Sequence, residues 1–361
     1  MNCLFADLER EWRGGQNQAL LTLAGLRERG HGVELAALEN SELARRAGAL
    51  GIPVHTVRPP FRRGRMAFLL RRLVMTQNVD VIHVNEPHSL TSAWLANVHQ
   101  VRPLVVSRRV GYPLQTNPFS LRRFRAARRI IANSQWVAKQ LAAAGITGER
   151  VQVVHEGVNV PAKLSPETMQ RARESWKIEK STVLLGCLGA LLPDKGQEWL
   201  IRALASLRIE FPGCRLLLAG DGPCRGRLEH LTRDLHLESA VIFAGFIENV
   251  ESVYAALDVF LLPSLFEAFN NSLLAAMSYE LPAIVFAKGA LPEIVEHEKS
   301  GLLVSGPDVE EIAAAVARLL KDRALSARLG QAARQRVAKN FSADQMVEGT
   351  AKVYSEVIAG M

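Results

Sequence analysis

The sequence alternates short apolar runs with segments of helical periodicity over almost its whole length. In the second half, apolar runs cover 182–188, 214–219, 240–243, 258–262 and 282–286, and helical segments separate them at 197–210, 224–236, 250–256 and 271–279. Strands that are connected by helices run parallel and are buried on both faces, so their sequences are continuously apolar. The alternation therefore predicts a doubly wound parallel sheet.

The first half repeats this pattern, with a helical segment at 16–29 that follows a Gly-Gly turn. Its expected strands are 33–38, 53–57, 80–84, 103–107, 129–132 and 151–154. A chain of 361 residues exceeds what one hydrophobic core usually organises, and the polar, proline-containing stretch 159–180 is the best linker candidate. We predict an α/β protein of two doubly wound Rossmann-like domains, 1–160 and 161–340, that face each other across a cleft.

Composition narrows the class of protein. Hydrophobic residues make up 48% and charged residues 22% of the chain, as in globular proteins. The cysteines show no CxxC pair and no histidine spacing that would form a zinc site, so we interpret them as core residues in a reducing compartment: Cys3, Cys187, Cys214 and Cys224. No apolar run reaches the length of a membrane span, and Asp7, Glu9 and Glu11 argue against a signal peptide. We expect a cytoplasmic protein.

Positive charge is concentrated in one segment of the first half. Residues 58–129 contain fourteen arginines, no lysine and only two acidic residues, whereas the rest of the chain is slightly acidic. Phenylalanines and leucines interleave with these arginines, and such a surface favours anionic partners. We predict an anionic membrane or an acidic glycolipid as the partner, with the protein peripheral on the inner face of the cell membrane. Two alternatives remain. One is binding of nucleic acid, which we do not expect, and the other is a basic face that is merely solvated.

The segment LLPSLFEAFNNSLLAAMSYELPA, residues 261–283, joins an expected buried strand to a helix through a small polar turn. Asn270, Asn271 and Ser272 are N-cap residue types, so the first N–H groups of the helix would point over the carboxyl end of the strand. Such N–H groups bind anions, and a carboxylate beside them, that of Glu267, suits the hydroxyls of a sugar. The segment predicts a sugar and phosphate pocket; the alternative is a solvated glutamate beside an ordinary cap.

Several segments of the chain resemble, in order and spacing, the motifs of the family 4 GT-B glycosyltransferases. Residues 261–283 resemble the donor signature PSxxEGFGxxxLEAMAxGxP, 186–204 the GRLxPxKGxxxLIxA segment, 216–228 the LxxxGxGPxxxxL segment, and 245–258 the turn and helix beside the nucleobase. REWRGGQNQALLTLAGLRERGH resembles the family's glycine loop and first helix. FSADQMVEGTAKVYSEVI resembles the helix that crosses back, so we expect residues 341–359 to pack on the first, acceptor-side domain, with the second domain binding the donor.

The resemblance implies a retaining transferase that moves a sugar from a UDP-, GDP- or ADP-linked donor to a glycan or glycolipid acceptor, as in the synthesis of lipopolysaccharide or another cell-envelope glycan. It implies no cofactor, because the nucleotide-sugar is a co-substrate, and no required metal; the sequence contains no DxD triplet. Lys195 stands at the family's KG position and is the predicted catalytic cation that offsets the charge of the departing diphosphate. Gly14 and Gly15 match the loop whose backbone approaches the donor phosphates. The alternative for Lys195 is a surface lysine at the start of a helix, and the alternative for Gly14 and Gly15 is a plain turn.

The remaining predicted site residues also follow from motif positions. Glu267 matches the glutamate that binds donor sugar hydroxyls and is the second predicted catalytic residue. The residues that match the donor-lining backbone are Phe269, Asn270, Asn271, Ser272 and Leu273. Candidates for contacts with the acceptor or sugar follow strands of the first domain: Glu86, His88, Arg108 and Arg109. The family often has a histidine near the last of these, whereas this chain has SRRVGYP, and the alternative for His83 and His88 is simple packing or exposure.

Three positions depart from the family pattern. The glutamate that binds the ribose falls on Ala275, the arginine of GRL on Ala190, and the glycine that ends the motif helix on Glu280. A lost charge-assisted hydrogen bond to ribose would weaken donor binding by roughly 1.5–3 kcal/mol, and a left-handed Glu280 would cost about 1 kcal/mol relative to glycine. These departures leave a second hypothesis open, a catalytically silent GT-B scaffold that binds a glycan precursor or a partner.

A third hypothesis is a dinucleotide-dependent oxidoreductase. Gly220, Gly222 and Gly226 follow an expected strand, as in a dinucleotide fingerprint. Their spacing is GxGxxxG rather than GxGxxG, and no acidic residue is matched on a following strand. The active glycosyltransferase is therefore the favoured hypothesis.

Overall fold

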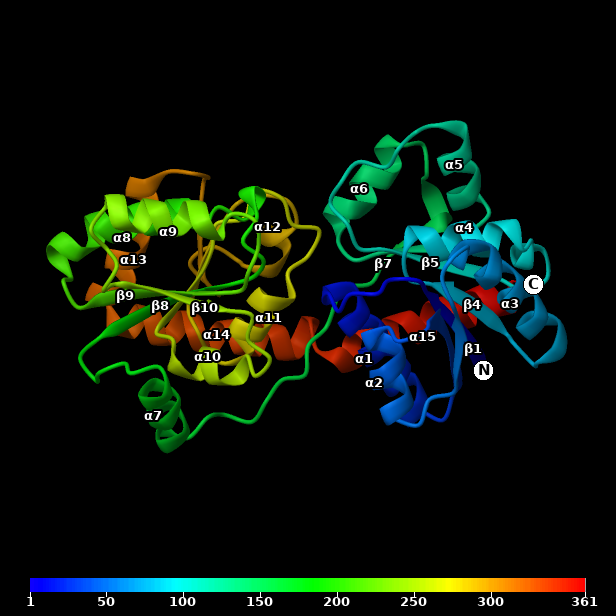
Figure 1. The fold of residues 1–361 in the computed structure, drawn as a ribbon, viewed down its shortest axis with the longest axis horizontal. Coiled ribbons are helices and arrows are strands. Elements are labelled where there is room, and N and C mark those ends of the chain that lie inside the picture. The colour runs from blue at the N-terminus through cyan, green and yellow to red at the C-terminus, as the bar shows by residue number, and fades with distance from the viewer. Residues whose placement is uncertain (361) are drawn as a thin grey trace. The chain divides into compact units, whose positions relative to one another are not determined.

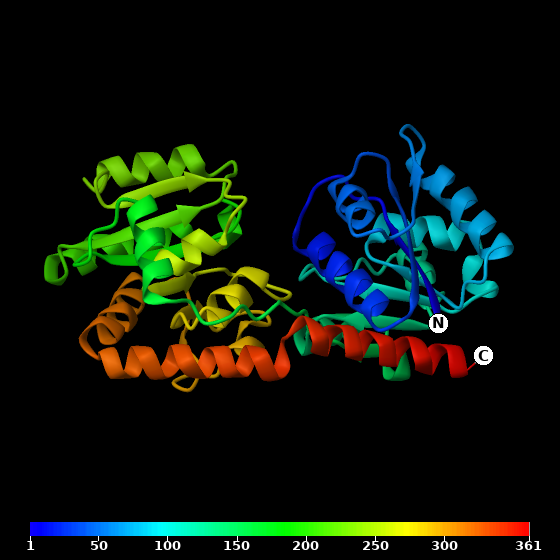
Figure 2. The ribbon, with the colours of Figure 1, turned by 90° about the horizontal axis from the view of Figure 1, so that it is seen from below.

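The computed structural model describes residues 1–360, which form two compact units (Figures 1 and 2). Unit 1 contains Met1–Gly157 together with the segment from Ala343 onward, and unit 2 contains Val158–Ser342. Within the described residues, no helix has both the length and the apolar character that crossing a membrane requires.

Unit 1 is built, within residues 1–360, on seven parallel strands in the order β3-β2-β1-β4-β5-β6-β7. The strands are β1 (Asn2–Asp7), β2 (Gly32–Leu38), β3 (Val54–Val57), β4 (Val81–Val84), β5 (Leu104–Arg108), β6 (Arg129–Ala132) and β7 (Val151–Val153). The helices are α1 (Gly14–Glu28), α2 (Glu42–Ala49), α3 (Arg62–Thr76), α4 (Pro87–Leu95), α5 (Pro118–Arg125), α6 (Gln135–Ala143) and α15 (Ala343–Ala359), with 3-10 turns η1 (Val98–Gln100) and η2 (Gly148–Arg150). The strand order reverses between β1 and β4, and loops at such a reversal form ligand sites.

Helix α15 closes the core of unit 1. It lies beside α1, β4 and β6 (Figure 2), and it contributes Met346, Val347, Val353, Tyr354 and Val357 to the hydrophobic cluster of this unit. A Cβ at Gly25 of α1 would lie 2.6 Å from Cγ2 of Val347, so glycine permits the close approach of the two helices. Tyr354 Oη bonds to Nδ1 of His83 on β4, and His83 Nε2 lies 2.8 Å from Ser107 Oγ. His83 is therefore a packed residue that fastens α15.

Unit 2 is built, within the same described range, on six parallel strands in the order β10-β9-β8-β11-β12-β13. The strands are β8 (Val183–Leu188), β9 (Cys214–Ala219), β10 (Val241–Gly245), β11 (Val259–Leu262), β12 (Ala283–Phe286) and β13 (Leu302–Val304). The helices are α7 (Pro166–Ser175), α8 (Gln197–Glu210), α9 (Arg225–Asp234), α10 (Glu251–Ala256), α11 (Asn271–Ser278), α12 (Leu291–Ile294), α13 (Val309–Lys321) and α14 (Arg323–Asn340), with the 3-10 turn η3 (Pro193–Lys195). Helices α8, α9 and α13 cover one face of the sheet, and α10, α11 and α14 cover the other (Figure 1).

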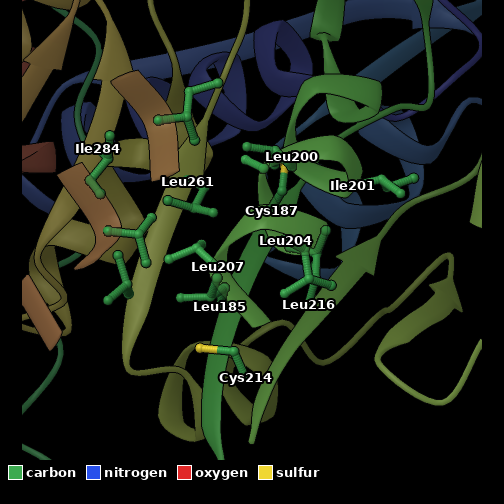
Figure 3. Packing of buried hydrophobic residues seen from close by; sticks show 14 of the residues in the cluster. Leu185, Cys187, Leu200, Ile201, Leu204, Leu207, Cys214, Leu216, Leu261 and Ile284 are labelled. Atoms are coloured by element: carbon green, nitrogen blue, oxygen red, sulfur yellow. The ribbon is translucent and has the colours of Figure 1, made fainter. Parts of the chain in front are cut away.

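The core of unit 2 is a continuous apolar cluster in which the sheet packs against α8 and against residues of α9, α13 and α14. Figure 3 shows Leu200 and Leu204 of α8 near strand residues such as Leu185, Cys187 and Leu216. All the cysteines of the chain are buried and unbridged, which confirms their interpretation as core residues. Burial raises the pKa of the Cys187 thiol to about 12, so this thiol is a packing group and no nucleophile.

The predicted pair of doubly wound Rossmann-like domains is confirmed, but several elements differ from the sequence prediction. Helices α12, α13 and α14, which follow β12, were not among the predicted elements. Strand β1 was missed, although it lies inside its sheet between β2 and β4, because six residues that end in an acidic segment carry too little periodicity. Strand β13 was also missed, since it has only three residues. The predicted linker 159–180 is wrong as a plain linker: it contains α7, which Ser165 caps and which packs on α10.

Candidate functional site

The loops that follow β8 and β11 meet at the carboxyl edge of the unit 2 sheet. Lys195 ends η3 after β8, and the next residue, Gly196, has a φ of 70°. A Cβ at Gly196 would lie 2.3 Å from the carbonyl oxygen of Pro263, the residue that follows β11. Only glycine combines this backbone conformation with this contact. The KG pair therefore brings the loop of Lys195 against the loop of Glu267.

Lys195 and Glu267 form an ion pair in which Nζ lies 2.7 Å from Oε1. The same carboxylate oxygen accepts a hydrogen bond from Nδ2 of Asn270 at 3.0 Å. The Glu267 side chain is only 7% exposed and that of Lys195 is 22% exposed, so the lysine is the solvent-facing partner. A buried carboxylate needs such partners to remain charged. The structure thus brings the two predicted catalytic residues into direct contact.

Asn270 is the N-cap of α11. Its Oδ1 accepts from the backbone N–H of Leu273 at 2.8 Å, so the Leu273 amide is engaged by the protein itself. Asn271 and Ser272 form the first turn of the helix, and the carbonyl of Ser272 accepts from Tyr254 Oη at 3.2 Å. The predicted phosphate-facing turn is therefore a capped helix start that contacts on two sides hold in place.

The backbone of Glu267 is held by residues that the sequence prediction did not include. Ala290 N donates to the carbonyl of Glu267 at 2.9 Å. A Cβ at Gly289, whose φ is 57°, would lie 2.4 Å from that carbonyl oxygen. Phe269 is buried and packs edge-to-face on Phe341, with ring centroids 5.6 Å apart. The sequence feature that could have identified Gly289 is its position in the turn KGALPEIV, which follows β12.

Ser264 is a second residue that the prediction missed. It lies in the loop after β11 and is fully buried, and no partner of its Oγ is present among residues 1–360. A buried hydroxyl without a partner is costly and calls for an explanation, such as a bound ligand. The serine of the PS pair in the donor-like segment was the signal for it.

The glycines of the proposed dinucleotide fingerprint have a packing role. A Cβ at Gly220 would lie 2.0 Å from the carbonyl oxygen of Gly189, and one at Gly222 would lie 2.5 Å from that of Leu191. Leu191 N in turn donates to Asp221 O at 3.0 Å. The loops after β8 and β9 could not come this close with side chains at these positions, and this accounts for both glycines without a dinucleotide.

The three departures from the family motifs occupy different surroundings. Ala190 is exposed and Ala275 is half-buried on α11. Glu280 has a φ of 62°, which confirms the predicted left-handed backbone. Its carboxylate lies 2.9 Å from Nζ of Lys163 and 3.8 Å from Nε of Arg334 on α14. The glutamate therefore makes contacts with its side chain that glycine could not make.

In unit 1, Gly14 and Gly15 begin α1 beside the carboxyl end of β1. The carbonyl of Gly15 accepts from Nδ2 of Asn85 at 3.2 Å. A Cβ at Gly15 would lie 3.8 Å from Cδ of Arg109, which is an ordinary contact. Packing within unit 1 therefore does not demand glycine at 15, and the predicted reason, backbone access for phosphate, stays a prediction.

A buried polar network that the sequence prediction missed, apart from Arg109, lines the carboxyl edge of the unit 1 sheet. Oδ2 of Asp7 accepts from Nδ2 of Asn85 at 2.8 Å, and Arg109 Nε reaches Asn85 Oδ1 at 3.3 Å. Oε1 of Glu156 accepts from Nη1 of Arg109 at 3.4 Å and from Nδ2 of Asn133 at 3.0 Å. Burial, with the nearby charge of Glu86 second, raises the pKa of Asp7 to about 6. Polar residues directly after strands were the available signal.

Glu86 is the N-cap of α4. Its carboxylate accepts from the backbone N–H groups of Leu8, His88 and Ser89, and burial raises its pKa. These bonds use much of its accepting capacity within the protein, so a structural role accounts for this residue. The candidate His88 lies half-buried beside it, and its Nδ1 is 2.7 Å from Nη2 of Arg63.

Arg108 is buried, and its guanidinium donates to the carbonyl of Tyr112 and lies 6.0 Å from the ring centroid of Phe124. Burial lowers its pKa. Arg109, in contrast, belongs to the polar network and is paired with Glu156. The two adjacent arginines therefore have separate surroundings, and Arg109 is the one whose guanidinium joins the sheet-edge network.

The oxygen and nitrogen atoms of Glu9, Glu86 and His88 lie within 4.8 Å of one another, as metal ligands would. The chemistry fits poorly, because Glu86 caps a helix and Nδ1 of His88 faces the guanidinium of Arg63. Independence from metal remains a prediction.

The basic segment 58–129 is only partly a surface. Its solvent-facing arginines on α3 and α5 are Arg63, Arg65, Arg71, Arg72, Arg122 and Arg125. Exposed aromatic rings accompany them, with Phe61 82%, Phe68 73% and Phe119 50% exposed. Other arginines serve unit 1 internally, since Arg102 bonds to Val79 O. The exposed part keeps the basic and aromatic character that the sequence indicated.

Two family models match the chain. The model described as Glycosyltransferase Family 4 matches residues 12–161, and the model described as Glycosyl transferases group 1 matches residues 168–336. The first match covers most of unit 1 and ends just inside unit 2, and the second lies wholly within unit 2.

Individual relatives agree with these matches. An uncharacterized glycosyltransferase of Methanocaldococcus jannaschii is 31% identical over 211 residues, 57% of this chain and 54% of that protein. The GDP-mannose-dependent alpha-(1-6)-phosphatidylinositol monomannoside mannosyltransferase of Mycobacterium tuberculosis is 33% identical over 196 residues, 51% of this chain and 50% of that protein. The chain thus matches about half the length of these curated relatives. The crystal structure of Anabaena HepE in complex with UDP and glucose has a TM-score of 0.84 at 25% identity, covering 98% of this chain and 99% of that one.

Proposed function

Because this chain belongs to the family 4 type of GT-B glycosyltransferases, we propose that it transfers a sugar from a nucleotide-sugar donor to a glycolipid or cell-surface polysaccharide precursor. The transfer retains the configuration of the anomeric carbon. The observation that carries the proposal is the Lys195–Glu267 pair at the edge of unit 2, with Asn270 bound to the same carboxylate. Anabaena HepE, which binds UDP and glucose, supports a nucleotide-sugar as the donor.

The residues of unit 2 divide the work on the donor. Lys195 carries the positive charge that the departing nucleoside diphosphate needs, and the positive end of the α11 helix dipole favours the same phosphates. Glu267 accepts hydrogen bonds from the hydroxyls of the sugar and so orients it. The bond between the anomeric carbon and the phosphate oxygen breaks, the acceptor oxygen bonds to that carbon from the same face, and the proton of the acceptor hydroxyl passes to the diphosphate. Lys195 makes this possible without a metal ion, and no cofactor takes part.

The acceptor approaches unit 1. The exposed arginines and aromatic rings of α3 and α5 suit an anionic membrane, which would hold the protein peripherally on the cytoplasmic face. The mycobacterial relative, by its name, acts on a phosphatidylinositol monomannoside, and this supports a lipid-linked acceptor. Arg109, the polar group that the sheet-edge network positions, is the candidate for contact with the acceptor or sugar.

A silent scaffold that binds a glycan precursor is the second candidate. The specific observation in its favour is that Ala275 and Ala190 lack the groups that family members use for ribose and diphosphate. The retained Lys195, Glu267 and Asn270 favour the active enzyme.

Calorimetric titration with UDP, GDP and ADP, and with the sugars linked to each, separates the two candidates. The wild type, Ala275→Glu and the uncharged control Ala275→Gln are compared. Saturable micromolar binding by the wild type would support a working donor site and name the nucleotide. Absence of binding in the wild type, with recovery in Ala275→Glu alone, would overturn the enzyme in favour of the scaffold.

A further inference from the structure

Two helices of unit 1, α3 and α5, bring arginine side chains together around His88 of α4. Arg63 of α3 contacts Nδ1 of His88 at 2.7 Å, and Arg62 of the same helix bonds to the carbonyl of Leu8. Arg123 of α5 donates from Nη1 to Oγ1 of Thr91 on α4 at 2.5 Å. The charges of Arg63, Arg62 and Arg123 all act on the imidazole of His88, and Arg63 also acts on Arg123. These three arginines and His88 are called the α3–α5 cluster below.

The hydrogen bonds within the cluster leave donors for a ligand. A guanidinium can only donate, so Nδ1 of His88 accepts from Arg63 and the proton of the neutral ring sits on Nε2. Among residues 1–360, Nδ1 is the ring nitrogen of His88 that makes a hydrogen bond, and Nε2 makes none. The Nε atom of Arg123 is buried and has no partner among the same residues. Unused donors of this kind favour an acceptor that comes from outside the protein.

The surroundings of the cluster are both apolar and basic. Arg123 stacks over Phe119 at 4.5 Å, and Phe119 packs edge-to-face on Trp94 of α4. Phe61, which precedes α3, is 82% exposed. The acidic groups nearby are Glu9, whose charge acts on His88, and Glu86, whose carboxylate caps α4. The cations therefore outnumber the acids that face them.

We infer that the α3–α5 cluster binds a phosphate group of the acceptor, with Arg63, Arg123 and Nε2 of His88 donating to its oxygens. This inference rests on the proposed function, because only a glycosyltransferase has an acceptor to which the phosphate could belong. A phosphate ester offers several anionic oxygens to converging donors and relieves the mutual repulsion of the arginines. The exposed rings suit the hydrocarbon or sugar that carries the ester.

Anion binding at this cluster should be coupled to a proton. Burial, and then the charges of Arg63 and Arg62, lower the pKa of His88, with Arg123 acting in the same direction and Glu9 against it. A bound dianion offsets the arginines and raises the pKa of His88 again, so the complex takes up a proton at Nδ1, and the Arg63 N–H that Nδ1 had accepted turns to the anion. Binding should therefore strengthen as the pH falls below about 6.5, the ordinary pKa of histidine.

Sulfate is the first probe, because it stays a dianion from pH 5.5 to 8. We expect calorimetry to show sulfate binding that tightens as the pH falls, and at least tenfold weaker binding in Arg63→Gln/Arg123→Gln. Arg71→Gln/Arg72→Gln, which removes the same charge from exposed positions of α3, is the matched control and should change binding less than twofold. His88→Gln keeps the arginines and should bind with a weaker pH dependence, and the part that remains comes from Glu86 and Asp7, whose pKa values burial raises. Equal weakening in both double variants would overturn the site in favour of diffuse attraction.

Vesicles then separate a lipid phosphate from a soluble one. Phosphatidic acid and phosphatidylglycerol vesicles of matched surface charge present a monoester and a diester, and a hexose 1-phosphate presents the same monoester without a lipid. A cluster-dependent preference for phosphatidic acid over the hexose phosphate assigns the group to a lipid, and the reverse preference assigns it to a soluble ester. Cluster-independent binding of both would reject the site.

UDP, GDP and ADP binding in the same preparations separates this inference from the proposed function. Nucleotide binding without cluster-dependent sulfate binding would reject only the phosphate site. Sulfate binding without any nucleotide or nucleotide-sugar binding would reject the glycosyltransferase while the anion site stands.

Discussion

Lys195 and Glu267 stand 72 positions apart in the sequence, and their side chains form an ion pair with Nζ and Oε1 2.7 Å apart. Each of the two groups is the natural partner of one half of a nucleotide-sugar. Phosphate competes for the lysine, and sugar hydroxyls compete for the carboxylate. We therefore expect donor binding to exchange this pair for two contacts with the ligand.

Replacement of Lys195 by methionine should affect turnover more than donor binding. The lost cation acts on charge that develops in the transition state, so kcat should fall about 10²–10³-fold while the donor Kd changes less than tenfold. Steady-state kinetics and calorimetry on the same variant check this. Unchanged kcat would remove Lys195 from the mechanism.

The free energy of unfolding provides an independent test of the Lys195–Glu267 ion pair. Lys195→Met leaves the buried Glu267 carboxylate without its cation, which should lower the free energy of unfolding by about 1.5–3 kcal/mol. The double variant Lys195→Met/Glu267→Gln should regain most of that stability and none of the activity, as urea denaturation and kinetics would show. A double variant as unstable as the single one would contradict the pairing.

Gly289→Ala should displace the backbone of Glu267. The added Cβ meets the carbonyl oxygen of Glu267 at 2.4 Å, and φ is 57°, so we expect a loss of about 1–3 kcal/mol of stability and at least tenfold weaker donor binding. Gly226→Ala on α9 is the matched control, since nothing lies within 4 Å of its Cβ. That control should stabilise the protein by about 0.5–1 kcal/mol. Equal effects of the two variants would refute the argument.

Glu280 allows backbone strain to be measured separately from side-chain contacts. Glu280→Ala and Glu280→Gly both lose the ion pairs with Lys163 and Arg334, but only alanine keeps the cost of a left-handed residue at φ 62°. The alanine variant should therefore be less stable than the glycine variant by about 1 kcal/mol in urea denaturation. Equal stability would mean that the backbone relaxes at this position.

His83 should make stability depend on pH. Burial lowers its pKa to about 3, so the folded state binds fewer protons than the unfolded state between pH 6.5 and about 3. The stability that neutral His83 contributes is complete above pH 6.5 and is lost on acidification, by up to about 1.4 kcal/mol per pH unit. His83→Gln does not titrate and should show a shallower fall of Tm between pH 6.5 and 4.5. Parallel Tm curves for the two proteins would contradict this.

The sequence was sufficient to predict the two α/β domains, because buried parallel strands and their helices leave strong local patterns. It also singled out Lys195 and Glu267 separately. It could not pair them, since their contact depends on β8 and β11 being neighbours, and strand order is set by packing far along the chain.

The residues that were missed share the same reason. Asp7 ends β1, whereas Asn133 and Glu156 follow β6 and β7, and only the assembled sheet places them at one edge. Gly289 is important because an added Cβ would collide with the carbonyl of Glu267. Ser264 is important because its buried hydroxyl has no hydrogen-bond partner among residues 1–360. Neither property can be read from the sequence. For the basic segment, composition overestimates the positive charge at the surface. A buried arginine such as Arg108 contributes to composition as much as an exposed one.

The position of α15 has a consequence for biosynthesis. Unit 2 is one uninterrupted stretch of chain, whereas the core of unit 1 lacks Val353 and Tyr354 until the ribosome has passed through all of unit 2. Unit 2 can therefore fold first as a nascent chain, while the earlier-made strands of unit 1 wait with an uncovered apolar face. During this interval the exposed apolar face makes unit 1 prone to aggregation, and we expect a chain released before α15 is made to be more sensitive to proteolysis.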